Sequence, residues 1–314
     1  MEHGPIKSSR AVIGFLIPIL AVFAASAARA DIMLQQAANY GLLFEGAGGN
    51  TLQITNVTVN GNVGVGNTGK ATDSGPSTIN GGLFFSAANI GQFSNNNAGN
   101  VITGGVHYNI ADVTAALNYV NSLNSTLGAE SGTSININHT TTINASSGIL
   151  DGNGNRVFRV TGFNTTNGDI LTINGDAAHD NVVLNFIGLN ANFNNQVVLN
   201  GINSDSVLFN FVGGSNLTGG PSLQINNNAS SSPSNLVQGI FLDPNGAISV
   251  TNARLNGRVF GGDTHDFQYV SGSTLSSPNV PPVPEPASLT LALLALPGLI
   301  GVSCISWIRR RQIA

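Results

Sequence analysis

Charged residues are scarce in this sequence. Only 8% of its 314 residues are Asp, Glu, Lys or Arg, against about 25% in an average soluble protein. The chain instead contains 42 Asn and many Ser and Thr, so amides and hydroxyls must meet the solvent. Between residues 31 and 280, five cations stand against 13 carboxylates, a net charge of −8. Five scattered cations cannot neutralise a run of phosphates, which argues against nucleic acid as a partner.

Cysteine is limited to Cys304, in an apolar segment near the C-terminus. Residues 31–280 therefore have no disulfide and no Cys-ligated zinc. The sequence also lacks the Gly-x-Ser-x-Gly, His-Glu-x-x-His and phosphate-loop signatures. We predict that the protein is not an enzyme and that its stability comes from a long, repetitive core.

The N-terminal segment 1–30 has the three parts of a secretory signal peptide. Lys7 and Arg10 are followed by an apolar run over residues 11–25 and by Ala28-Arg29-Ala30. The apolar run is shorter than the roughly 20 residues that a spanning helix needs. We predict that signal peptidase cleaves after Ala30 and that the remaining chain is exported.

The C-terminus also has three consecutive parts. Residues 276–286 form a Pro/Ser-rich linker that ends in Pro284-Glu285-Pro286, residues 287–308 are apolar and uncharged, and residues 309–314 begin with Arg309-Arg310-Arg311. Twenty helical residues span about 30 Å, the hydrocarbon thickness of a bilayer. The segment predicts a transmembrane helix with a basic stop-transfer block in the cytoplasm.

This arrangement resembles the PEP-CTERM sorting signal of Gram-negative bacteria. The resemblance implies that an exosortase cuts near Pro284-Glu285-Pro286. The protein would then move from a transient inner-membrane anchor to the cell surface or extracellular matrix. An ordinary single-pass tail anchor is the alternative.

Short apolar motifs with Gly and Asn or Thr recur between residues 31 and 275. The segments 59–63, 79–83 and 102–106 are alike, and the segment 183–186 matches 208–211. Apolar residues in the body mostly alternate with polar ones, as in β-strands. We predict a mainly β fold, a β-solenoid in which each turn of chain takes roughly 20–25 residues.

A solenoid also explains the low charge. Adjacent turns stack about 4.8 Å apart, so a charge repeated in one column would face like charge. Neutral Asn can form amide ladders along the stack, and Gly and Asn can take the positive φ of corners. A disordered low-complexity chain is the alternative, but the regularly spaced aliphatic residues and Phe oppose it.

Residues 112–127 break the two-residue pattern and predict one amphipathic helix along the solenoid. We expect Asp112 to cap its N-terminus and Gly128 to end it. The apolar residues at three- and four-residue steps are Val113, Ala116, Leu117, Val120, Leu123 and Leu127.

The segments 60–66, 207–211, 239–247 and 255–262, with the helix between the first two, resemble the choice-of-anchor A family of bacterial surface proteins. The sequence departs from this family at Glu45-Gly46-Ala47-Gly48, where Gly-Asp-Leu is usual. The resemblance implies an exported, ice-binding-like β-helical domain with a suspected role in adhesion.

One loop has the ligand spacing of a calcium site. Asp151, Asn153 and Asn155 place side-chain oxygens at alternate positions, as Ca²⁺ requires. However, Arg156 occupies the position of the EF-hand Gly, and Gly162 occupies that of the bidentate Glu. We therefore predict an Asn/Gly turn, with no metal or cofactor, and keep a weak calcium site as the alternative.

Two groups of ionisable residues could hold a metal or act as a general base. Both lie in Gly/Asn-rich segments, where Asp commonly bonds the local backbone, so we expect structural roles. The first group is Asp169, Asp176, His179 and Asp180, and the second is Asp263, His265 and Asp266.

The sequence is compatible with two main functions. The first is a structural or adhesive matrix protein that presents a neutral rod to exopolysaccharide or neighbouring cells in a biofilm. The second is an ice-binding module, which needs Thr or Ala at a fixed position of a flat face. We expect no such recurrence, because Thr140-Thr141-Thr142 and Thr55 show none. A polysaccharide-cleaving β-helix enzyme is a remote third.

Overall fold

The computed structural model describes residues 32–176, 181–213, 222–229, 234–262 and 265–277. These residues form three largely parallel sheets and one long helix, α1 (Ala111–Ala129), which confirms the predicted mainly β fold with one helix. The short 3-10 helices among them are η1 (Gln35–Asn39), η2 (Ala47–Gly49), η3 (Ile90–Gln92), η4 (Ala145–Ser147) and η5 (Ser204–Ser206).

Sheet A has 15 strands, arranged as a main ladder with a branch. In spatial order the main ladder is β10 (Val106–His107), β7 (Leu83–Phe85), β4 (Val63–Val65), β1 (Leu42–Phe44), β23 (Arg254–Gly261), β21 (Val237–Asp243), β19 (Val207–Val212), β16 (Asn181–Ile187), β14 (Asn155–Asn164) and β11 (Thr133–Asn138). The branch leaves β23 through β25 (Thr274–Ser276), β3 (Thr58–Asn60), β6 (Thr78–Asn80) and β9 (Val101–Ile102), and β13 (Ile149–Leu150) pairs with β14.

Sheets B and C complete the described strands. Sheet B contains β17 (Ala191–Phe193), β20 (Leu223–Ile225), β22 (Ile248–Thr251), β24 (Phe267–Val270), β2 (Thr51–Thr55), β5 (Lys70–Asp73) and β8 (Phe93–Asn95). Sheet C contains β12 (Thr141–Asn144), β15 (Ile170–Asn174) and β18 (Gln196–Asn200).

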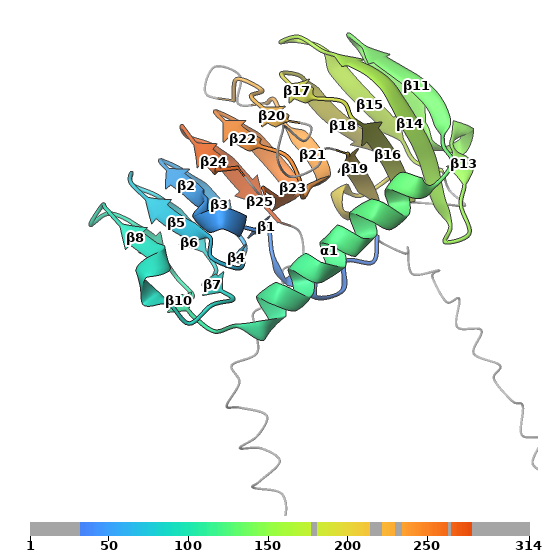
Figure 1. Ribbon diagram of the computed structural model, residues 1–314. Coiled ribbons are helices and arrows are strands. Elements are labelled where there is room, and N and C mark those ends of the chain that lie inside the picture. The colour runs from blue at the N-terminus through green and yellow to red at the C-terminus, as the bar shows by residue number, and fades with distance from the viewer. Residues whose placement is uncertain (1–31, 177–180, 214–221, 230–233, 263–264, 278–314) are drawn as a thin grey trace, which may run out of the picture.

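The turns of chain do not stack in sequence order. Strands β1 to β10 extend from the middle of the stack to one end, α1 runs along its length, and β11 to β25 return from the other end (Figure 1). The last strands then pair in parallel with the first, β23 with β1, β24 with β2 and β25 with β3. The N-terminal half (β1–β10) and the C-terminal half (β11–β25) therefore share one hydrophobic core.

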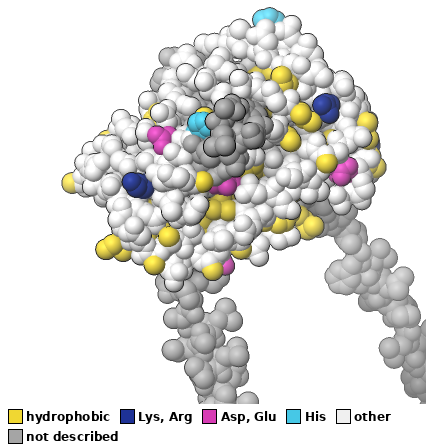
Figure 2. All heavy atoms as spheres, in the orientation of Figure 1, with side chains coloured by type: hydrophobic (Ala, Val, Ile, Leu, Met, Phe, Trp, Pro, Cys, Tyr) yellow, Lys and Arg dark blue, Asp and Glu magenta, His cyan; other side chains and the backbone are white. Residues whose placement is uncertain are grey.

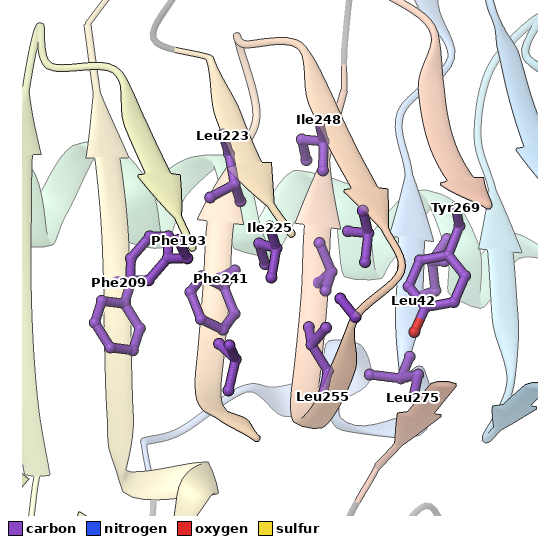
Figure 3. Close-up of a cluster of buried hydrophobic side chains, with 14 of the residues drawn as sticks. Leu42, Phe193, Phe209, Leu223, Ile225, Phe241, Ile248, Leu255, Tyr269 and Leu275 are labelled. Carbon is purple, nitrogen blue, oxygen red and sulfur yellow. The ribbon is translucent and has the colours of Figure 1, made fainter. Parts of the chain in front are cut away.

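The repeats found in the sequence are register partners. Val59 pairs with Ile79, and Ile79 pairs with Ile102. Alternate side chains of the sheets point inward, and away from the end strands most of them are almost completely buried. Figure 3 shows Phe193, Phe209 and Phe241 directed toward one another between the sheets.

Asparagine forms the predicted ladders on the outside of the stack. Asn80 Nδ2 donates to Asn60 Oδ1 at 2.7 Å, and the same bond joins Asn174 to Asn144 at 2.8 Å and Asn200 to Asn174 at 3.0 Å. Non-glycine residues with positive φ are mostly asparagines, including Asn56, Asn228 and Asn252.

The bend within β21 and β23 requires glycine. Gly257 lies in register with Gly239 and has a φ of 149°. A Cβ atom on Gly257 would lie 1.9 Å from the Gly239 carbonyl oxygen. Because no larger side chain fits there, the two glycines let the long strands β21 and β23 bend together.

The helix covers the outer side of the main ladder, together with the segment from Ile32 to Tyr40. Asp112 does not cap it, and that prediction was wrong. The backbone is already helical at Ala111, Ile110 is the N-cap, and Asp112 lies in the first turn, where its charge still suits the helix dipole.

The predicted end of the helix at Gly128 was also wrong, because α1 continues to Ala129. A Cβ atom on Gly128 would lie 2.7 Å from the Val212 side chain. Glycine at this position therefore allows α1 to approach β19 closely.

Three buried asparagines fix α1 on the main ladder. Asn124 Nδ2 donates to Asn210 Oδ1 and to the Phe211 carbonyl, both at 2.7 Å. Asn210 Nδ2 donates to Asn185 Oδ1 at 2.8 Å, and Asn185 Nδ2 donates to the Leu127 carbonyl at 2.7 Å. These directional bonds set the position of the helix along the ladder.

A buried ion pair holds the segment that precedes β1. Arg258, only 2% exposed, donates from Nε to Asp205 Oδ1 at 3.1 Å. Its Nη1 also donates to the carbonyls of Ala38 and Tyr40, at 2.7 and 2.8 Å. The guanidinium thus ties η5 and the N-terminal segment to β23.

Candidate functional site

Two broad surfaces of the stack remain outside α1. One is the outer side of sheet B, and the other is formed by sheet C and the branch of sheet A. Charged side chains are few and isolated on the face shown in Figure 2. The candidate site therefore has to be sought among amides and hydroxyls.

On the outer side of sheet B, one uncharged residue of each strand lines up with the corresponding residue of the next strand. We call this row of residues the polar column. Each member is the register partner of the next, and its neighbours along the strand are largely buried. In spatial order the polar column is Asn192, Gln224, Ser249, Gln268, Gln53, Thr72 and Ser94.

The second surface carries Thr and Asn on either side of a buried aliphatic residue. We call these the Thr/Asn rows. In the branch of sheet A, Thr78 pairs with Thr58 and Thr58 with Thr274. In sheet C, Thr142 pairs with Thr172. The accompanying row residues are Asn80, Asn60 and Ser276 in the branch, and Asn144, Asn174 and Asn200 in sheet C.

The expectation that Thr does not recur at a fixed position was therefore wrong. The segments 58–61, 78–81 and 172–175 all read Thr, aliphatic, Asn, Gly. This signal was present in the sequence, but the spacing between copies varies and hides it from a search for a fixed period. The rows are interrupted where Val101 is the partner of Thr78 and Arg254 the partner of Thr274.

Both surfaces have the same chemistry. Amides donate and accept hydrogen bonds, as hydroxyls do, and they do so without attracting or repelling ions. They differ in side-chain length, because the polar column mixes long Gln with short Ser and Thr, whereas the Thr/Asn rows consist mostly of Thr and Asn and are interrupted by Val101, Val198 and Arg254. Lys70 is the only exposed charged residue in the described strands of sheet B.

The loop with calcium-like spacing is a tight turn between β13 and β14. Asp151 Oδ1 accepts from the backbone N–H groups of Asn153 and Asn155, at 2.9 and 2.7 Å. Asp151 Oδ2 accepts from Asn155 Nδ2 at 2.7 Å. Both carboxylate oxygens thus bond within the turn, and the described residues contain no group of three His, Cys, Asp or Glu that could hold a metal.

Among the described members of the two ionisable groups, Asp169 and Asp176 bond different neighbours. Asp176 accepts from Arg156 Nη2 at 2.7 Å, whereas Asp169 bonds Thr166, Thr140 and His139. The backbone N–H of Thr166 is the main cause of the lowered pKa of Asp169. His179, Asp180 and Asp263 lie outside the described residues. In the second group Asp266 Oδ1 accepts from Thr51 N at 2.8 Å, and His265 also has an interaction partner.

Two carboxyl groups that the sequence did not single out are buried inside the stack. Burial raises the pKa of Asp73 to about 6, partly opposed by the Ser77 hydroxyl, and raises the pKa of Asp243 well above its ordinary value. Both side chains belong to the interior and not to either exposed surface.

The predicted export and sorting residues lie outside the described ranges. They comprise Ala28 and Ala30 of the cleavage site, Pro284-Glu285-Pro286, the apolar segment 287–308 and Arg309-Arg310-Arg311. Within the described ranges, no helix is long and apolar enough to cross a membrane.

The described residues combine parallel sheets, one long covering helix and largely neutral faces in a β-rich domain. The family model of the ice-binding-like adhesive domain matches residues 27–272, and the chain belongs to this family. A model of the PEP-CTERM protein-sorting motif matches residues 282–311, which include the Pro-Glu-Pro tripeptide and the three arginines.

Solved structures of ice-binding proteins are similar to this chain. One, from an Arctic yeast and described with antifreeze activity, is 16% identical, covers 81% of this chain and 97% of its own, and has a TM-score of 0.50. Another, from an Antarctic Flavobacteriaceae bacterium, is 14% identical, covers 82% of this chain and 52% of its own, and has a TM-score of 0.50. At these identities the likeness shows the fold alone. No curated protein sequence matches the chain.

Proposed function

We propose that this protein is an adhesive or structural component of a bacterial cell surface or biofilm matrix. In this proposal the signal peptide is removed after Ala30, and a β-solenoid body is exported. An exosortase then acts near Pro284-Glu285-Pro286 after transient anchoring of residues 287–308 in the inner membrane of a Gram-negative cell. Membership of the adhesive-domain family and the sorting-motif match support this order of events.

The polar column is the observation that carries the adhesive role. Seven uncharged donors and acceptors lie in register along sheet B, at a strand spacing of about 4.8 Å. Neutral exopolysaccharide offers many hydroxyl groups and no charge, so it matches this chemistry. The uneven lengths of Gln, Ser and Thr suit a flexible polymer better than a crystalline surface.

The test is retention of the full chain on a neutral glucan, with anionic alginate as the comparison. Gln53→Ala, Gln224→Ala and Gln268→Ala together should reduce retention at least tenfold. The matched control replaces Asn118, Ser122 and Ser125, exposed on α1, by Ala and should bind as the wild type does. Wild-type protein that ignores the glucan, or binding that survives the triple Gln variant, would refute the proposal.

Ice binding is the second candidate, and the Thr/Asn rows favour it. Thr58, Thr78 and Thr274 form a regular file of the kind that a flat ice-binding surface needs, although Val101 and Arg254 interrupt it. Thermal hysteresis of the full chain tests this candidate. Activity that Thr58→Lys and Thr78→Lys abolish, and that the Gln variants leave intact, would select ice binding over adhesion.

We infer that the body is neither an enzyme nor dependent on a cofactor. Asp151, Asp169 and Asp176 all bond neighbouring groups, and Asp73 and Asp243 are buried in the stack. A polysaccharide-cleaving activity would need two or more of these acids to converge on one groove. Release of reducing ends from the same glucan and alginate would overturn this inference.

A further inference from the structure

Both ends of the stack leave strand edges without a second partner among the described strands. Strands β8, β9 and β10 form one end, and β11, β12 and β13 form the other. Each pairs with a single neighbouring strand. At the first end the inward side chains are only partly buried, because no further turn covers them, whereas at the second end Ile135 is partly buried but Ile137 and Ile143 are buried. These partly buried residues include Phe93, Ile102, Val106 and Tyr108 at the first end, and Ile135 at the second.

Exposed apolar side chains gather at the same two ends. Only five large hydrophobic residues of the described chain are strongly exposed. Ile90 and Val101, exposed by 75% and 49%, lie at the first end, and Ile149 and Leu150, exposed by 46% and 42%, lie at the second. Met33 is the fifth. The exposed apolar surface thus marks the ends rather than the long faces.

Both ends also lack the charges that normally protect a sheet edge. Residues 74–111 and 131–150 contain no Asp, Glu, Lys or Arg. Natural sheets usually place Lys or other charges on such edges to prevent pairing with another chain. These two stretches supply the end strands, so no charged side chain of the end strands themselves opposes contact there.

The two ends are complementary in strand direction. All described strand pairs are parallel except β13 with β14. A second copy shifted along the stack axis therefore brings its β11 and β12 beside β10 and β9 in the parallel sense. We propose that the protein assembles head to tail, with the β8–β10 end of one copy on the β11–β13 end of the next.

Such a contact uses two different surfaces and does not close on itself, so it generates a fibre. It covers the partly buried core residues at both ends. It also continues sheet A and the Thr/Asn rows from one copy to the next. The inference concerns self-association and is independent of which ligand the long faces bind.

The test uses the full chain and two end-blocking variants. Val101→Lys places a charge on the first end, and Leu150→Lys places one on the second. We expect the wild type to form species whose mass grows with concentration in sedimentation velocity, and each variant alone to lose them. An equimolar mixture of the two variants should form dimers and nothing larger, because one free end of each kind remains.

Asn118→Lys, on the exposed side of α1, is the matched control and should assemble as the wild type does. Circular dichroism of all variants establishes that they are folded. A wild type that stays monomeric, a single variant that still forms fibres, or a mixture that stays monomeric would each overturn the proposal. Association through the terminal segments would be equal in all variants and would not produce this pattern.

Discussion

The turns of the stack differ in length, and the longest ones lie in the C-terminal half. In the N-terminal half, the equivalent residues Asn60 and Asn80 are 20 positions apart. In the C-terminal half, Asn144 and Asn174 are 30 apart, and Asn174 and Asn200 are 26 apart. The closing turns become short again, since the paired Ala253 and Ser273 are 20 positions apart.

The core side chains differ in the same way. The interior of the N-terminal half is mainly aliphatic, with Val59, Val63, Val65 and Leu83 among its buried residues. In the C-terminal half, rings contact one another across the interior, and Phe209 stacks on Phe241 at 4.7 Å. The other members of this aromatic cluster are Phe163, Phe186, Phe193 and Phe211.

In this stack the length of a turn and the size of the core side chains that it encloses are matched. A longer turn encloses a wider cross-section, and interiors are packed to the density of organic crystals, so wider turns need larger side chains. Val, Ile and Leu, with Phe44 and Phe85, fill the short turns of the N-terminal half, whereas the longer turns of the C-terminal half hold the larger cluster of Phe side chains.

Truncation of a central ring should therefore be the most damaging change. We expect Phe209→Ala to lower the free energy of unfolding by about 3–5 kcal/mol, and Val59→Ala in the N-terminal half by about 2 kcal/mol. Urea denaturation of both variants measures the difference. Equal losses would show that the two halves do not differ in core architecture.

The junction between the halves should be nearly as sensitive. Arg258→Ala removes the partner of the buried Asp205 and the donors to Ala38 and Tyr40. We expect a loss of about 3–5 kcal/mol, as for other broken buried ion pairs. Hydrogen exchange should accelerate over residues 32–40. Lys70→Ala, at an exposed position, is the control, and a similar effect there would contradict this role of Arg258.

Much of this architecture could be predicted from the sequence. The partners Val59, Ile79 and Ile102 were visible as repeats, and three- and four-residue spacing revealed the helix. The pairing of β24 with β2 was not visible, because it joins segments near opposite ends of the described chain through geometry alone. The Thr/Asn rows were missed because their members recur at unequal distances along the chain, although their registers align.

The two halves also differ in how α1 is held, because buried amides fix the C-terminal part of α1 on the C-terminal half of the stack. Asn210→Ala leaves Asn124 and Asn185 without their mutual partner in a buried site. We expect a loss of about 1–3 kcal/mol. Asn80→Ala, in an exposed ladder, should cost less than about 0.5 kcal/mol. Equal costs in thermal unfolding would argue against a docking role for the buried network.

The smallest expected effect concerns pH and belongs to the N-terminal half. Burial raises the pKa of Asp73 to about 6 from an ordinary value of 3.8. Below the ordinary value both folded and unfolded chains are protonated, so the carboxyl imposes no penalty. Between pH 4 and pH 6 the unfolded chain loses its proton first, and the stability of the fold decreases as pH rises.

Asp73→Asn should remove this dependence. Because a buried amide also has a desolvation cost, we expect a gain of about 1 kcal/mol at pH 7 and none at pH 4. Melting temperatures across this range measure both values, and Asp112→Asn is the control: it removes an exposed carboxylate whose charge suits the dipole of α1, so it should not gain stability at pH 7. Equal gains in stability at pH 4 and pH 7 would show that the shape of the Asp73 side chain, and not its ionisation, lowers the stability of the N-terminal core.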